Sequence, residues 1–75
     1  MKKVKLSNKK EIQIRVPKVR DIKALGMIEN PIEKEVVLIS NLSGVSIEEL
    51  DDMELKDYSL LSAAVNDFLY LNGAM

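Results

Sequence analysis

The chain contains no cysteine and no histidine among its 75 residues. Without cysteine it can form neither disulfides nor thiolate metal sites, and without histidine it lacks the commonest metal ligand and the commonest general base. Its three glycines lie too far apart to form a phosphate-binding loop. We therefore expect no enzymatic activity and no bound cofactor or metal ion.

Long apolar runs are also missing. No segment approaches the roughly 18 apolar residues that indicate a membrane-spanning helix, and the basic opening MKKVKLSNKK is not followed by the apolar core of a signal peptide. We expect one cytoplasmic domain over residues 1–75, with no membrane contact. A domain of this size buries only about 60% of its unfolded surface, so a partner or a second copy is expected to add buried area.

Charged residues are unevenly distributed along the chain, although the net charge is only −1. Residues 1–23 hold nine of the eleven lysines and arginines against two acidic residues, a balance of +7. Residues 24–75 hold two lysines against ten acidic residues, a balance of −8. This asymmetry favours association with a partner, while oppositely charged faces that neutralise each other within one domain explain it equally well.

Residues 3–16 alternate between apolar and polar side chains. Side chains of a strand point alternately to opposite faces, so the pattern predicts a β-hairpin with one wet face and a turn near Ser7 and Asn8. The apolar residues of this pattern are Val4, Leu6, Ile12, Ile14 and Val16.

Helix signals fill the rest of the chain. Asn30 precedes Pro31 as a capping residue, Gly44 follows as a stop, and Ser46 with Glu49 forms a capping-box pattern. These signals and the apolar spacing predict helices over about residues 18–25, 31–43, 47–51 and 54–71. The expected class is α+β, an N-terminal two-stranded β-hairpin followed by three to four α-helices in one small domain.

The acidic run ELDDMELKD covers the end of the third predicted helix, the bend after it and the start of the last one. It lacks the glycine and the alternating oxygen donors of an EF-hand calcium loop. Acidic side chains favour helix N-termini because of the helix dipole. We therefore interpret the run as a solvated face and not as a metal site.

The last predicted helix is apolar around most of its circumference. Such a helix buries more than one side, either against the hairpin or against a helix from a second copy or a partner. The candidate partner-binding residues on this helix are Tyr58, Leu60, Leu61, Ala64, Val65, Phe68, Leu69 and Leu71. Leu60, Ala64 and Leu71 are the expected contacts if the central stripe is already buried.

Two other functions compete with partner-helix binding. The wet face of the hairpin carries Lys3, Lys5, Gln13 and Arg15, which suits a nucleic-acid-binding regulator that inserts a β-ribbon into a groove. Acidic helices and a lack of stacking aromatics on this face argue against nucleic acid. A self-assembling small structural protein, a homo-oligomer, is the other alternative.

Residues 19–69 resemble the small tail assembly chaperones of contractile-tailed bacteriophages and prophages. The matching residues are Glu35, Leu38, Ile39, Ser40, Leu42, Ser43, Gly44, Glu48, Glu49, Leu50, Asp57, Tyr58 and Phe68. The resemblance implies a non-enzymatic protein that binds the helical tape-measure protein of the phage during tail assembly. It also implies that the protein acts in the host bacterial cytoplasm and is absent from the mature virion.

Overall fold

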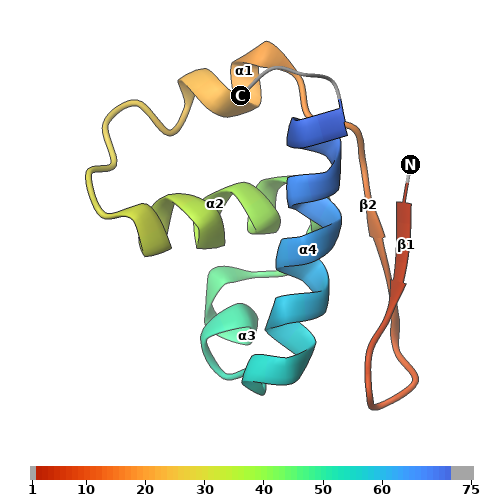
Figure 1. Ribbon diagram of the computed structural model, residues 1–75. Helices are drawn as coiled ribbons and strands as arrows, with labels where there is room; N and C mark the ends of the chain where they lie inside the picture. The colour runs from red at the N-terminus through yellow and green to blue at the C-terminus, as the bar shows by residue number, and fades with distance from the viewer. Residues whose placement is uncertain (1, 72–75) are drawn as a thin grey trace.

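The computed structural model describes residues 2–71, which form an antiparallel hairpin followed by four helices (Figure 1). The strands are β1 (Lys2–Lys5) and β2 (Glu11–Ile14). The helices are α1 (Val19–Lys23), α2 (Pro31–Ser43), α3 (Ile47–Asp51) and α4 (Leu55–Leu71). The expected α+β class is confirmed, and α3 and α4 are two separate helices.

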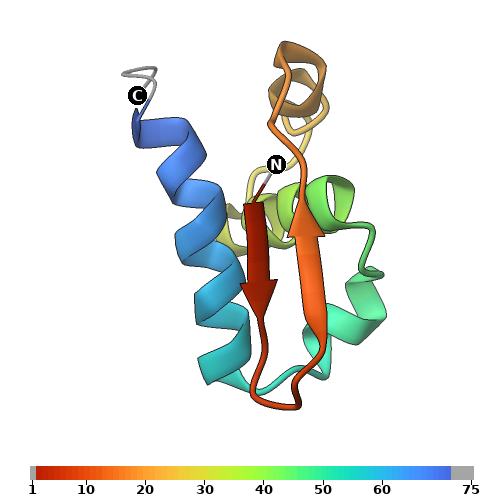
Figure 2. The same cartoon turned by 90° about the vertical axis from the view of Figure 1, so that its right-hand side faces the viewer.

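The hairpin turns one face to the helices and the other to solvent (Figure 2). Val4 pairs with Ile12 across the two strands, and both side chains are buried. The turn is closed by a backbone bond of 2.9 Å from the Leu6 N–H to the Lys10 carbonyl. The turn includes Ser7 and Asn8, as predicted, and Lys9 after them has a positive φ of 69°.

The strand pairing ends earlier than the sequence pattern suggests. Val16, which the alternation places on the buried face, is exposed. Ile14 pairs with Lys2, the first residue of β1, so no residue of β1 lies opposite Val16. The next backbone N–H, that of Arg15, donates instead to the Leu42 carbonyl of α2 at 3.0 Å.

Capping residues set the ends of α2 and the start of α3. The side chain of Asn30 accepts hydrogen bonds from the first free N–H groups of α2, and Pro31 occupies the first helical position. At the other end, Gly44 adopts a left-handed conformation with a φ of 77°. The hydroxyl of Ser46 then accepts from the Glu49 N–H at 3.1 Å and starts α3.

Helix α1 is shorter than the predicted range of 18–25. The backbone N–H of Lys18, the N-cap residue, donates to the carboxylate of Asp21 at 2.7 Å, as in one half of a capping box, while the Lys18 side chain makes no capping hydrogen bond. After Lys23 the N–H groups of Leu25 and Gly26 bond to carbonyls three residues back. Such bonds tighten the last turn into a 3₁₀-like end, so the helix gives way to a turn.

The core lies between the inner face of the hairpin and the helices α2 and α4 (Figures 1 and 2). Ile14, Ile39, Leu61 and Val65 are fully buried at its centre. In the view of Figure 1, α3 covers the lower end of this core, where its Leu50 side chain is buried. The complete set of buried apolar residues is Val4, Leu6, Ile12, Ile14, Leu38, Ile39, Leu42, Val45, Leu50, Leu61, Ala64 and Val65.

Candidate partner-binding surfaces

Most of the candidate residues on α4 lie in or against the core. Leu61, Ala64 and Val65 are buried, and Tyr58 and Phe68 are partly buried and pack against the same cluster. Leu60 is exposed. The side chains of Leu69 and Leu71 lie outside the described residues.

Polar contacts at both ends of α4 anchor it to the rest of the domain. The hydroxyl of Tyr58 donates to the carboxylate of Glu35 on α2 at 2.7 Å. Burial and this hydrogen bond both raise the pKa of Tyr58. Near the other end, Lys2 pairs with Asp67 and lies 5.9 Å from the ring centroid of Phe68. A partner would therefore reach Leu61 or Val65 only if α4 left the hairpin, and a binding role for those residues stays a prediction.

The basic face of the hairpin carries less free charge than the sequence suggests. Lys3, Lys5 and Gln13 are exposed there, but Glu11 is on the same face, 4.0 Å from the Lys3 ammonium. Arg15 is engaged with Asp21 through two hydrogen bonds of 2.7 and 2.8 Å. One of the four candidate nucleic-acid contacts thus serves the fold, and a second lies close to a carboxylate.

The ion pair of Arg15 and Asp21 joins the end of the hairpin to α1. Asp21 is buried, and its carboxylate also accepts the Lys18 N–H. The Arg15 guanidinium and that N–H together lower the pKa of Asp21 to about 2. The sequence gives little sign of this pair, because Arg15 belongs to the polar side of an alternating strand and Asp21 is the one acidic residue within the basic residues 15–23.

A polar hollow of about 310 Å³ lies between the tip of the hairpin and the bend from α3 to α4. The Ser7 hydroxyl and backbone N–H both donate to the Asp57 carboxylate, at 2.8 and 3.0 Å, and lower its pKa. Lys10 pairs with Glu49 at 2.9 Å across the same hollow. These two contacts hold the tip of the hairpin to α3 and α4.

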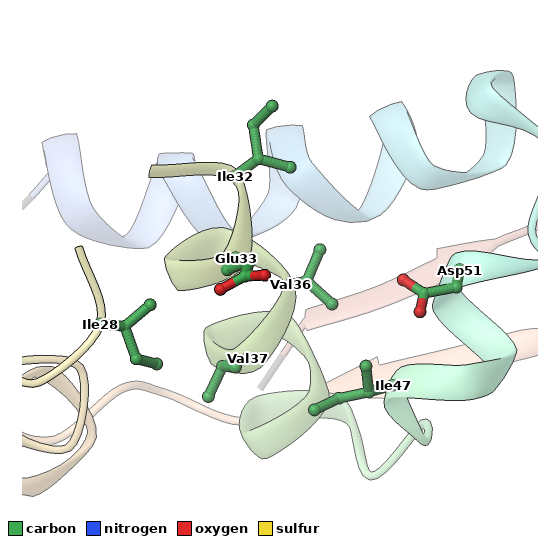
Figure 3. A pocket seen from close by; sticks show the side chains of 7 residues that line it. All are labelled: Ile28, Ile32, Glu33, Val36, Val37, Ile47 and Asp51. Atoms are coloured by element: carbon green, nitrogen blue, oxygen red, sulfur yellow. The ribbon is translucent and has the colours of Figure 1, made fainter. Parts of the chain in front are cut away.

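An apolar groove of about 350 Å³ lies on another side of the domain. Figure 3 shows that Val36 and Val37 of α2 lie at its centre, with Ile28 from the preceding loop on one side and Ile47 from α3 on the other. The residues that line it are Ile28, Ile32, Glu33, Val36, Val37, Ile47 and Asp51. We call this surface the α2–α3 groove.

The groove leaves large apolar side chains in solvent. Ile32 is 72% exposed and Ile47 is 44% exposed, whereas no apolar residue of the core is more than 9% exposed. Two carboxylates, Glu33 and Asp51, belong to the lining, and neither forms an ion pair with any residue that the structure describes. A hollow with an apolar centre and a few polar groups is the usual form of a binding site, and exposed apolar patches commonly mark protein interfaces.

This groove was not identified from the sequence. Ile32, Val36 and Val37 are apolar positions of the helix predicted over residues 31–43, and the spread of apolar positions around that helix was the available signal. A stripe wider than one contact face leaves some of its residues outside the core. The contribution of Ile47 depends on how α3 folds back beside α2, which periodicity does not reveal.

Two other features, a membrane-spanning helix and a cluster of metal-ligating side chains, are absent from the described residues. No helix within residues 2–71 is both long and apolar enough to cross a bilayer. In the same range, no three acidic side chains come together in a way that could hold a metal ion.

Comparison with known proteins agrees with a binding role. Residues 4–70 match the family model described as phage tail assembly chaperone proteins, E, or 41 or 14. The match runs from the hairpin into the last turn of α4 and so covers nearly the whole domain. Neither the curated proteins nor the solved structures contain a match to the chain. On the strength of the family match, the chain belongs to the phage tail assembly chaperone family.

Proposed function

We propose that this protein is a non-enzymatic chaperone that binds the tape-measure protein of its phage during tail assembly. It acts in the host cytoplasm and leaves the client before the virion is complete. Membership of the tail assembly chaperone family supports an assembly role. The α2–α3 groove is the surface that we propose binds the client, because its apolar side chains are not covered by the domain itself.

The physical reason for such a chaperone lies in its client. A long apolar helix exposes stripes that associate with one another in water until the tail is built around it. A small domain that offers an apolar groove can cover part of a stripe, in the manner of helix-in-groove recognition. The α2–α3 groove contributes apolar side chains from three chain segments, which gives a helix side chain contacts on several sides.

Co-expression with the tape-measure protein encoded in the same phage genome tests the proposal. We expect the client to become soluble and to co-purify with the wild-type protein. Ile32→Asp should lower the amount of recovered complex, because it places a charge in the groove. Leu55→Asp is the matched control, since Leu55 is 77% exposed, starts α4 and lies outside the groove.

Both substitutions are compatible with folding because each lies in the first turn of a helix and is largely exposed. Circular dichroism would verify that each variant keeps its helices. A client that stays insoluble and does not co-purify with the wild-type protein would overturn the proposed function. Equal recovery with Ile32→Asp and Leu55→Asp would leave the function in place and remove the groove as its surface.

A further inference from the structure

A second exposed apolar surface lies on α1. Val19 is 75% exposed and Ile22 is exposed three residues later. Positions three apart lie on one side of a helix, so both can enter the same hollow. Met27, just beyond the helix, is also exposed. Since these side chains remain in solvent, α1 does not use them to fill the groove of its own chain.

The charges on α1 are opposite to those of the groove. Lys18, Arg20 and Lys23 lie in or directly before α1, and all three are exposed. None of them forms a side-chain ion pair with another residue of the described range. The groove contributes the unpaired carboxylates Glu33 and Asp51 beside its apolar centre. One element of the chain thus offers apolar and basic groups, and another offers an apolar hollow with acidic groups.

We infer that the α2–α3 groove takes the α1 segment of a second copy of this chain when no client is bound. Val19 and Ile22 enter the apolar centre, and the basic residues face Glu33 and Asp51. The hairpin of a second copy is a poorer occupant, because its exposed face carries lysines without apolar side chains. The contact joins two different surfaces, so it generates a closed pair if it is reciprocal and a larger assembly if it is not.

Beyond the proposed function, a second copy would occupy the groove in the time between synthesis of the chain and binding of the client. Self-association covers the apolar side chains that would otherwise be exposed, which lowers non-specific aggregation. A client that needs the same groove then displaces the second copy. Client binding would therefore separate the two copies of the chaperone.

The test is the mass of the purified protein, without client, by light scattering and sedimentation over a range of concentrations. We expect the mass to rise with concentration and the association to weaken as salt is added, because the charged groups are exposed and are screened. A groove variant, Glu33→Lys with Asp51→Lys, should lower the affinity by about tenfold or more. An α1 variant, Arg20→Glu with Lys23→Glu, should do the same for the opposite reason.

Mixing these two charge variants gives the decisive result. Each alone opposes like charges, whereas the acidic α1 of one fits the basic groove of the other, so the mixture should associate again. Lys5→Glu, on the exposed face of the hairpin, is the control for net charge and should leave the association unchanged. A wild-type protein that stays monomeric at every concentration, or variants that do not recover on mixing, would overturn the inference. Neither result would bear on client binding, which is measured separately.

Discussion

At the level of single residues, Asp21 combines burial with three hydrogen bonds. Its two carboxylate oxygens accept from the Arg15 guanidinium, and one of them also accepts the Lys18 N–H. Removing a buried charged acceptor leaves its donors without partners and costs about 1–3 kcal/mol. Since Arg15 remains partly exposed and can be hydrated, we place the cost of Asp21→Asn at the lower end of this range.

The same residue predicts how stability depends on pH. The pKa of Asp21 is about 2 in the folded protein, against about 3.9 for an aspartate in an unfolded chain. Protonation therefore favours the unfolded chain, and the free energy of unfolding should fall as the pH drops from about 4 towards 2. Asp57, whose pKa is also lowered, acts in the same direction.

Urea unfolding at a series of pH values, with wild type and Asp21→Asn side by side, measures this effect. We expect the variant to lose less stability than the wild type on acidification, because its amide does not titrate. Asp67→Asn is a suitable control, since Asp67 also forms an ion pair, with Lys2, but on the surface. Identical acid dependence of Asp21→Asn and wild type would contradict the assigned role of the carboxylate.

At the level of helices, Gly44 ends α2 with a φ of 77°. A side chain with a Cβ atom is strained in this left-handed conformation, whereas glycine is not. No neighbouring atom lies within 4 Å of where a Cβ would stand, so the cost of Gly44→Ala comes from the backbone and not from a clash. We expect the free energy of unfolding to fall by about 1 kcal/mol.

Thermal or urea unfolding of Gly44→Ala and Gly44→Asn would check this assignment. Asparagine tolerates the left-handed conformation better than alanine, so it should recover part of the lost stability. Gly26, which has no positive φ, provides the comparison position. An alanine at residue 44 that leaves stability unchanged would show that the helix does not end in the described conformation.

Local signals predicted most of the elements, because the residues that end each helix act on their nearest neighbours. Asn30, Pro31, Gly44 and Ser46 each do in the structure what their positions suggest. The end of β2 depends instead on a distant part of the chain, because β2 stops pairing where β1 begins. Helix α1 was predicted too long because its last residues adopt a tight turn whose bonds the apolar spacing does not distinguish.

At the scale of the whole molecule, α2 and α4 differ in how much of their apolar surface the domain itself covers. The sequence favoured α4 for partner contacts, yet Leu61 and Val65 are fully buried. The hairpin covers one side of α4, and α2 keeps an uncovered apolar side at the groove. Which of the two helices buries more of its apolar surface depends on how the whole domain packs. The apolar periodicity of each helix alone could therefore not predict it.

Substitutions on α4 and in the groove can measure this difference. Leu61→Ala should lower the free energy of unfolding by about 2–5 kcal/mol, because it opens a cavity in a fully buried position. Leu60→Asp should leave stability nearly unchanged and leave client binding intact. Ile47→Asp, in the groove, matches it in exposure, at 44% against 46%, and should weaken client binding. If Leu60→Asp weakens binding and Ile47→Asp does not, the client surface is on α4.

The proposed chaperone function requires that this domain keeps an apolar helical client from aggregating. The most direct measurement dilutes denatured tape-measure protein into buffer and follows light scattering with and without the purified domain. We expect wild-type protein and Leu55→Asp to suppress the scattering in proportion to their concentration, and Ile32→Asp to suppress it much less. Scattering that rises equally with and without the wild-type protein would contradict the claim.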